Sequence, residues 1–549
     1  MKIVKCRLTI MFSPFQRIFS GMTTEERFVE TSKLTPIKRY IFIAVTFSIP
    51  VIFIVCLEIG LRLFNYGEDV SLFSRVEIGR RTFYRENPDV KYRYFGKSAF
   101  HPSTSPTYFA MPKPAGVYRI FCLGGSTTVG YPYYYNGAFS TYLRDRLKAI
   151  FPQKEVEIIN LGMTATSSYT ALDIGTELAR YQPDLIIDYD GHNEFYGALG
   201  AASNQTVGSS RFFTLLYLRM IHCRTFQLMR DGLNGIARLW GRTNDTLSRG
   251  TEMERLSRGA YVQPGSELYN KTCSIFRENL IALREYCRSS GIPLILGTQV
   301  SDLRDQPPFI SSYSGNKMQD SILENAMKRG HEFENPGKID SAIIEFQNAI
   351  SIDSSHAGAH YRLARCYDEA GKKSNALAEY ILARDDDELR FRTDSKFNDL
   401  IRTMADGRDC FVADMEKFFM TESPDSLIGH NLITEHLHPN SRGDFLIAKC
   451  YSEVMKANGL LATKAEWTKN DTIEDAELWG SRSITELDEQ IAKQSTDVLT
   501  SGWPFKNQAP RGDSISPSDT IGEIAQQVVD GNLDWGNAHL RAINFYQRR

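Results

Sequence analysis

The chain has 549 residues, which is too long for one ordinary domain, so we expect two or more folded units. Hydrophobic residues make up 42% and charged residues 24%, the balance of a globular protein. The formal net charge of -2 excludes a global basic field, so no nucleic-acid partner is expected. The nine cysteines are scattered singly without a CxxC pair, which is typical of buried structural thiols and not of a metal site.

A segment near the N-terminus is apolar enough to cross a membrane. Residues 40–57 contain no charge, and 59–64 extend the run to the length that a bilayer requires. The basic residues nearest to it are mostly on its N-terminal side: Arg27, Lys33, Lys38 and Arg39 before it, and Arg75 after it. This bias predicts a single-pass membrane protein with a cytoplasmic segment at 1–39, a transmembrane helix at 40–64 and the remainder extracytoplasmic, on the periplasmic or cell-surface side. A buried core helix and a cleaved signal peptide are the alternatives.

Beyond the segment 65–115, interpreted as a linker with an irregular lead-in, apolar strand-like runs alternate with helical runs. The expected strands are 117–123, 156–161, 185–189, 292–300 and 410–414, and the expected helices between them are 137–150, 169–181 and 277–289. This alternation predicts an α/β fold whose parallel sheet is covered by helices on both faces. The sheet domain would consist of 116–317 and 396–460, with its site at the carboxyl ends of the strands.

Between these two parts the chain is helical and repeats itself. Six positions recur thirty-four residues later: Gly330, Phe333, Gly337, Ala342, Phe346 and Ala349 become Ala364, Tyr367, Gly371, Ala376, Tyr380 and Ala383. This period and pattern resemble tetratricopeptide repeats, and two unrelated helix pairs are the alternative. We expect residues 318–395 to be an inserted α-helical repeat pair that binds a protein partner, covered by flanking helices near 318 and at 395–404.

The C-terminal part, 461–549, is expected to be a helical tail, and no role follows from its sequence. A polar helix is predicted at 483–494, beginning with a capping box of Ser483 and Glu486. A loop rich in Pro, Gly and Ser at 502–517 separates it from two more predicted helices, at 520–529 and 533–546.

The chemistry is indicated by motifs that lie far apart. Ser126 follows an apolar strand on a glycine turn, and Glu435 and His438 are three residues apart in a single loop. A serine hydroxyl needs an adjacent base, for which histidine oriented by a carboxylate is suited. Gly162 and Asn193, each just after a predicted strand, would join the Ser126 N–H as donors to an oxyanion. Because a carboxylate favours the charged imidazole, we expect the pKa of His438 to be near or above about 6.5.

These motifs resemble the SGNH (GDSL-type) hydrolases. The order of Gly-x-Ser-Thr-Thr-x-Gly, a glycine in the next exit loop, Gly-x-Asn and acid-x-x-His-Pro-Asn is that of the family. The resemblance implies a flavodoxin-like three-layer sandwich. It also implies catalytic Ser126, Glu435 and His438, and an oxyanion hole of Ser126, Gly162 and Asn193, without metal or organic cofactor. An N-terminal span and inserted tetratricopeptide repeats make the chain similar to membrane-anchored bacterial members of the superfamily.

Three residues depart from the family pattern: Gly125 and Glu194 replace aspartates, and the triad acid is a glutamate, Glu435. The main hypothesis is a membrane-anchored serine hydrolase acting on ester bonds, as an esterase, deacetylase or acyl transferase, with an acylated glycan or lipid of the envelope as substrate. The alternative is a weak or inactive hydrolase domain that serves with the repeats as a protein-binding scaffold. The aromatic run 131–135 would be either a wall for a sugar or acyl group or an ordinary half-buried loop. A metal on His430, Glu435, His436 and His438 is the less favoured interpretation of that loop.

Overall fold

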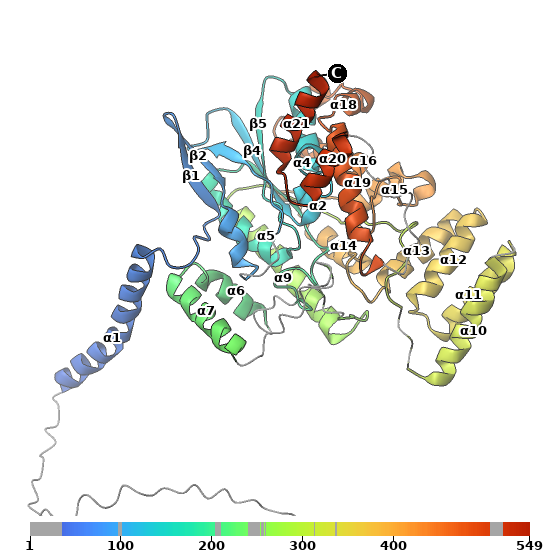
Figure 1. Ribbon diagram of the computed structural model, residues 1–549, viewed down its shortest axis with the longest axis horizontal. Coiled ribbons are helices and arrows are strands. Elements are labelled where there is room, and N and C mark those ends of the chain that lie inside the picture. The colour runs from blue at the N-terminus through green and yellow to red at the C-terminus, as the bar shows by residue number, and fades with distance from the viewer. Residues whose placement is uncertain are drawn as a thin grey trace, which may run out of the picture. The chain divides into compact units, whose positions relative to one another are not determined.

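The computed structural model describes residues 36–96, 102–203, 210–239, 253, 257, 260–311, 313, 315–334, 337–505 and 520–548. Most of the expected cytoplasmic segment 1–39 and most of the expected loop 502–517 lie outside these residues. The chain divides into two units, residues 1–65 and 66–549 (Figure 1).

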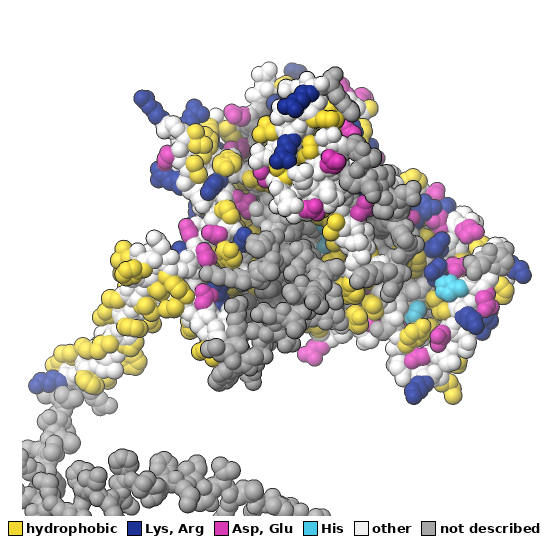
Figure 2. Space-filling view, viewed as in Figure 1, with side chains coloured by type: hydrophobic (Ala, Val, Ile, Leu, Met, Phe, Trp, Pro, Cys, Tyr) yellow, Lys and Arg dark blue, Asp and Glu magenta, His cyan; other side chains and the backbone are white. Residues whose placement is uncertain are grey.

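Helix α1 (Pro36–Leu63) is the described element of the first unit. Its 28 residues are long and apolar enough to cross a membrane. At 1.5 Å per residue the helix measures about 42 Å, more than the roughly 30 Å of a hydrocarbon core. Hydrophobic side chains cover the face of α1 that Figure 2 shows, as expected where lipid and not protein surrounds a helix. That α1 crosses a membrane, and in which direction, stays a prediction.

The second unit is built on a five-stranded parallel sheet. Its strands are β4 (Val117–Gly124), β5 (Glu155–Asn160), β6 (Leu185–Tyr189), β7 (Leu294–Gly297) and β8 (Cys410–Ala413). They are arranged β5-β4-β6-β7-β8, and every neighbouring pair is parallel. Counted along the chain this order is 2-1-3-4-5, the flavodoxin-like order, which confirms the predicted sheet. Strand order reverses between β4 and β6, so a crevice is expected where these two strands end.

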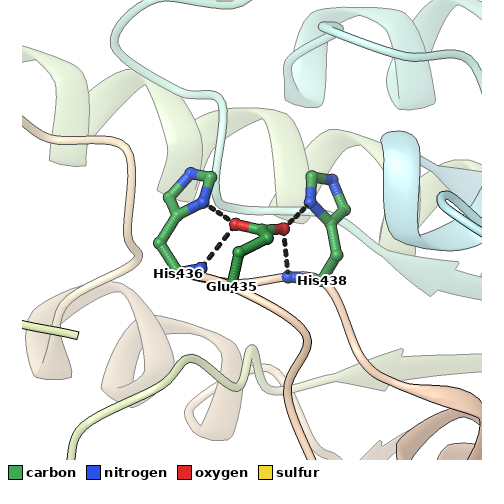
Figure 3. Close-up of side chains that lie close together, drawn as sticks. All are labelled: Glu435, His436 and His438. Carbon is green, nitrogen blue, oxygen red and sulfur yellow. Dashed lines mark hydrogen bonds and ion pairs between the residues drawn. The ribbon is translucent and has the colours of Figure 1, made fainter. Parts of the chain in front are cut away.

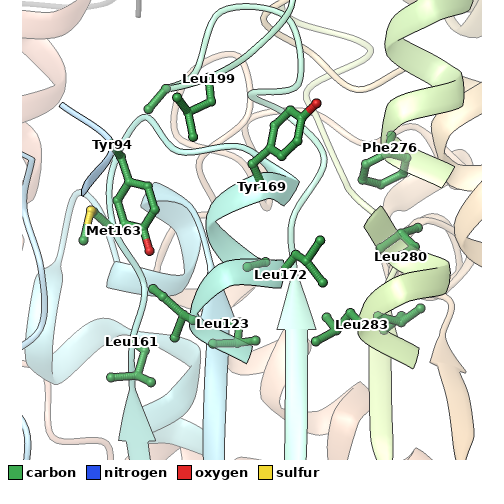
Figure 4. Packing of buried hydrophobic residues seen from close by; sticks show 14 of the residues in the cluster. Tyr94, Leu123, Leu161, Met163, Tyr169, Leu172, Leu199, Phe276, Leu280 and Leu283 are labelled. Carbon is green, nitrogen blue, oxygen red and sulfur yellow. The ribbon is translucent and has the colours of Figure 1, made fainter. Parts of the chain in front are cut away.

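Helices cover both faces of the sheet because side chains alternate along its buried strands. Phe121 and Leu123 of β4 belong to the hydrophobic cluster on one face, and Ile120 and Cys122 to the cluster on the other. The first face is packed with α5 (Ser168–Gly175), α9 (Glu267–Ser289) and α14 (Ser395–Arg402), as Figure 4 shows for α5 and α9. The second is packed with α4 (Phe139–Ile150), α15 (Met415–Glu422) and α16 (Ser441–Asn458).

The segment 65–115 differs from the irregular lead-in that the sequence suggested. It forms an antiparallel sheet of β1 (Phe73–Ile78), β2 (Arg81–Glu86) and β3 (Tyr108–Ala110), with a 3-10 turn at Pro88–Arg93. Its aromatic residues account for the strands, since Phe73 and Phe109 pack edge to face and reach Phe121 of β4. Partly exposed strands alternate too weakly in hydrophobicity to be read from sequence.

Four helices fill the repeating region: α10 (Lys317–Glu334), α11 (Ile339–Ile352), α12 (Ala357–Glu369) and α13 (Lys373–Asp385). The paired positions have matching environments. Ala342 and Ala376 are fully buried, and the turns after α10 and α12 contain Gly337 and Gly371 at φ +71° and +72°. Gly330 lies directly under Phe346, where a methyl group would not fit.

The end of this region belongs to the sheet domain, so the boundary predicted at 395 is too late. Leu389 and Phe391 are buried in the same cluster as Phe121. Arg392 is buried and donates to the carbonyls of Asp302 (2.9 Å) and Gln306 (3.0 Å). Residues 387–394 therefore connect the helices to the core of the sheet domain and do not form a free hinge.

The remaining described α-helices complete the second unit. They are α2 (Ser126–Val129), α3 (Tyr134–Gly137), α6 (Arg211–Met220), α7 (Arg224–Leu239), α17 (Lys464–Asn470), α18 (Asp475–Gly480), α19 (Glu486–Thr500), α20 (Thr520–Val529) and α21 (Trp535–Gln547). The predicted capping box of Ser483 and Glu486 is wrong by two residues, since Thr485 and Asp488 form it. Asp488 accepts from the Thr485 N–H (2.9 Å) and hydroxyl (2.7 Å), whereas Glu486, two residues earlier, accepts from the Tyr546 hydroxyl.

Candidate active site

The turn after β4 presents Ser126 at the switch point of the sheet. Gly124 has φ +143°, and a Cβ there would collide with Thr128 and with the carbonyl of Tyr189 on β6, so only glycine fits. The chain then enters α2, of which Ser126 is the first residue. The hydroxyl is thereby held at the end of β4, next to the loop that follows β6.

The loop that contains Glu435 and His438 is closed on itself by backbone hydrogen bonds. The Thr434 N–H donates to the carbonyl of His438 (2.7 Å), and the Asn440 N–H donates to that of Leu432 (2.9 Å). The Asn440 side chain then caps α16 by accepting from the Gly443 N–H (3.0 Å). Capping by Asn and closure of the loop explain why the motif ends in Asn directly before a helix.

Ser126, His438 and Glu435 form a continuous hydrogen-bonded chain although 312 residues separate the first two. Ser126 Oγ lies 2.7 Å from His438 Nε2. His438 Nδ1 contacts Glu435 Oε1 on its other side, and the His438 N–H also donates to that oxygen (3.1 Å). Glu435 is fully buried. This is the geometry of nucleophile, base and orienting acid in a catalytic triad.

The Glu435 carboxylate is shared by two imidazoles, as Figure 3 shows. Its second oxygen contacts Nδ1 of His436 and accepts from the N–H groups of His436 and Leu437. The chain therefore curls around the carboxylate and satisfies both oxygens. The glutamate side chain is one methylene longer than the aspartate of the family pattern, and the curved backbone of residues 435–438 accommodates that length.

Burial lowers the pKa of His438 to about 3, so its imidazole is neutral and able to accept a proton at neutral pH. This differs from the expectation of a value near or above 6.5. That expectation considered the attraction of the carboxylate alone, whereas the imidazole is also removed from water. The contact with Glu435 still favours the imidazolium once it has formed.

Of the expected oxyanion donors, Gly162 is not placed to serve. Its N–H donates to Asn160 Oδ1 (2.9 Å), because the Asn160 side chain folds back over the turn that follows β5. Asn193 lies in the loop after β6, and its Nδ2 is so close to Gly125 that a Cβ there would be 3.1 Å away. The residue before the nucleophile, an aspartate in the family pattern, is a glycine that gives this amide room.

Ser126 and Asn193 line one small pocket. Its other lining residues come from the same turn, from the end of β6 and from the loop after β7: Gly125, Thr127, Tyr189, Asp190, Gly191, His192 and Gln299. Within the part of the chain that the structure describes, neither the Ser126 N–H nor the Asn193 Nδ2 group has an acceptor. Both donors are therefore available to a group bound beside the Ser126 hydroxyl.

Buried acidic residues lie in and next to the loop after β6 that contains Asn193. Glu194, which replaces an aspartate of the family pattern, accepts from the N–H (2.8 Å) and hydroxyl (2.7 Å) of Ser168 and so fastens the Asn193 loop to α5. Burial raises the pKa of Glu194 and of Asp188 to about 7, and that of Asp190 also rises because of burial and its acidic neighbours. Burial lowers the pKa of His192 to about 3, and its Nδ1 accepts from the Thr393 N–H (3.1 Å).

The C-terminal tail, to which the sequence assigned no role, contacts the loop that contains Glu435 and His438. Tyr131, in the aromatic run after the nucleophile, packs on the His438 ring at 4.6 Å between centroids. Its hydroxyl donates to the carbonyl of Ser495 in α19 (3.0 Å). Phe505, beyond α19, packs against His436 at 5.3 Å. No local pattern in the sequence indicates these contacts.

Among the residues that the structure describes, two groups of side chains have the composition of metal ligands. Glu435, His436 and His438 form one, but their ligand atoms are already engaged with one another and with Ser126. His430 lies apart from them, in a group with Asp302 and Asp305. The structure thus separates the four residues that the sequence had suggested as a metal set.

No model of a known protein family matches the sequence, and no curated protein matches it. Solved structures that are similar include a lipolytic protein of the G-D-S-L family from Desulfitobacterium hafniense DCB-2, at 12% identity and a TM-score of 0.24 over 61% of this chain and 98% of that one. A two-domain esterase active on acetylated mannans has 14% identity and a TM-score of 0.23 over 63% of this chain and 50% of its own. An acetylxylan esterase from Geobacillus stearothermophilus has 11% identity and a TM-score of 0.21 over 62% and 94%. The resemblance to SGNH (GDSL-type) hydrolases rests on the sequence motifs.

Proposed function

We propose that this protein is a membrane-anchored serine hydrolase that acts on ester bonds. The observation that carries the proposal is the hydrogen-bonded chain from Ser126 through His438 to the buried Glu435. No structural need links a serine after β4 with a histidine 312 residues away, whereas nucleophilic catalysis requires that contact.

In the proposed mechanism the Ser126 hydroxyl attacks the ester carbonyl while its proton passes to His438 Nε2. Glu435 holds the imidazolium through Nδ1. The negative charge on the former carbonyl oxygen is stabilised by the Ser126 N–H and the Asn193 side-chain amide. The intermediate then expels the alcohol, which takes the proton from His438 and leaves Ser126 acylated. Water, or the hydroxyl of an acceptor, then takes the place of the alcohol, gives its proton to His438 Nε2 and attacks the acyl carbonyl. His438 returns the proton to Ser126 Oγ as the bond to the acyl group breaks.

We further propose an ester on an acylated glycan or lipid of the envelope as the substrate. The supporting observation is α1, which would place the catalytic unit on the extracytoplasmic side if the basic residues before it stay in the cytoplasm. Deacetylation, hydrolysis of longer esters and acyl transfer all share the first half of the mechanism.

The helices α10–α13 are proposed to be a tetratricopeptide-like pair that holds a protein partner. The support is that residues thirty-four positions apart have the same backbone conformation or the same burial. Gly337 and Gly371 both have positive φ, and Ala342 and Ala376 are both fully buried. A scaffold without hydrolase activity is the competing function.

The test is hydrolysis of p-nitrophenyl acetate by the full-length protein in detergent or vesicles. Ser126→Ala is expected to lower kcat by several orders of magnitude without a change in thermal unfolding. Ser289→Ala, at the exposed end of α9, is the matched control and should behave as wild type. An inactive wild-type protein would favour the scaffold, and a Ser126→Ala variant as active as wild type would refute Ser126 as the nucleophile.

A further inference from the structure

Helices α6 and α7 form a pair with an unusually apolar outer surface. Tyr217 of α6 packs against Phe226 of α7 with ring centroids 5.8 Å apart, and Figure 1 shows the two helices side by side. Seven large apolar side chains are at least 40% exposed, and together we call them the outer apolar face: Phe212, Phe213, Leu216, Met220, Met229, Leu233 and Ile236.

The outer apolar face follows the helical period and is not a scatter of single residues. Thr214 and Leu218 are buried on the inner side of α6, and Gln227 is buried on the inner side of α7. With 3.6 residues per turn, the seven exposed residues lie on the opposite sides of the two helices. Arg219 is the one charged residue that is exposed on α6 and α7 among the positions whose side chains the structure describes. A surface of this composition is costly in water.

The chain just after α1 is hydrogen-bonded to the inner side of α7. The Glu68 N–H donates to Gln227 Oε1 (2.8 Å), and Gln227 Nε2 returns a bond to the carbonyl of Glu68 (3.1 Å). The Tyr66 hydroxyl donates to Asp231 (3.4 Å). Residues 66–68 are thus fixed to α7 within the second unit of the structure.

The length of chain between α1 and this attachment is short. α1 ends at Leu63, and two residues, Phe64 and Asn65, lie between it and Tyr66, so three residue-to-residue steps connect the two. Three extended residues reach at most about 10 Å. An α-helix with its side chains is also about 10 Å across. If α1 spans a bilayer, this tether keeps residues 66–68, and the inner side of α7 to which they are bonded, within about 10 Å of the end of the span. The tether therefore permits the outer side of α7 to face the lipid.

We propose that the outer apolar face of α6 and α7 docks into the headgroup and acyl-chain boundary of the same membrane that α1 crosses. The inference rests on the membrane anchor in the proposed function and adds a second, peripheral attachment to it. Amphipathic helices bury such faces about 5–10 Å into this boundary. With both attachments, the catalytic unit has one orientation relative to the membrane plane, whereas a single span would leave it free to rotate about its tether.

The test uses the full-length protein in phosphatidylcholine vesicles whose acyl chains are brominated, compared with unbrominated vesicles. Leu233→Trp and Ile236→Trp place a fluorophore on the outer apolar face, and Leu540→Trp, equally exposed on α21, is the control. Bromine quenches only indoles that reach the acyl region. We expect brominated lipid to lower the added emission at 233 and 236 at least twofold and to leave that at 540 unchanged.

Flotation of the same vesicles separates the two ways in which the proposal can fail. A protein that does not float with the vesicles refutes the anchor and, with it, the docking. A protein that floats but is quenched equally little at 233, 236 and 540 refutes the docking alone. Shielding of position 233 from iodide without bromolipid quenching would show that a second copy or α1 covers this face, and it would likewise overturn the proposal.

Discussion

Replacing Glu435 with glutamine removes one charge at a fully buried position while keeping the size of the side chain. The carboxylate contacts Nδ1 of both His436 and His438. An amide has one acceptor oxygen and one NH₂ group, so it cannot accept from both rings in the same way. Where the NH₂ group faces His438, Nδ1 must accept, the ring proton moves to Nε2, and the ring can no longer take the proton of Ser126.

The size of the effect follows from that change of tautomer. In the serine-protease triad, replacing the acid with its amide lowers kcat about 10⁴-fold. At 1.36 kcal/mol per decade this is about 5.5 kcal/mol, which exceeds the 1.5–3 kcal/mol of one hydrogen bond to a charged group. We therefore expect Glu435→Gln to lower kcat by about 10⁴ with little change in KM. Glu435→Asp, which withdraws the carboxylate by one methylene from both rings, should lower kcat less.

The assay is steady-state hydrolysis of p-nitrophenyl acetate, with thermal unfolding to show that each variant is folded. Glu332→Gln, at an exposed position of α10, is the matched control. A Glu435→Gln variant that is folded and retains kcat within about tenfold of wild type would refute the role of Glu435 in orienting His438.

Three further predictions follow from the structure. Asn193→Ala should lower kcat about 10²–10³-fold and change KM less, because an oxyanion donor acts in the transition state; a change in KM alone would assign Asn193 to ground-state binding. Because burial lowers the pKa of His438, its active neutral form persists below pH 6.5, so kcat/KM should stay level from about pH 6.5 down to 5; an acid limb at 6.5 or above would show that attraction by the carboxylate outweighs burial. Gly337→Ala and Gly371→Ala should each lower the free energy of unfolding in urea by about 1–2 kcal/mol, because both residues have positive φ. An added Cβ meets no atom at either site, so no steric clash adds to this effect. Gly480→Ala is the control, and a cost at only one of the two turns would contradict their equivalence.

The sheet and the position of its site were predictable because buried parallel strands are continuous apolar runs. Ser126 and Asn193 follow two such runs, and their strands are neighbours in the sheet, so the topology alone brings them together. That Glu435 and His438 lie together was predictable because three residues in one loop can present both side chains. For these features the local sequence contains the information.

The features that the sequence did not reveal depend on contacts between distant or competing groups. The N–H of Gly162 was expected to face the oxyanion, but the Asn160 side chain two residues earlier accepts it instead. The sharing of Glu435 by His436 arises from the curl of the loop, and the packing of Phe505 on His436 depends on where the tail returns. Motif spacing describes neither kind of contact.

The most direct test of the central claim is labelling of the full-length protein with a fluorophosphonate, which reacts with an activated serine and leaves a stable adduct. Peptide mass analysis is expected to locate the adduct on Ser126, with none in Ser126→Ala and much slower labelling in Glu435→Gln. An unlabelled wild-type protein, or an adduct on a different serine, would contradict the assignment of Ser126, His438 and Glu435 as a working triad.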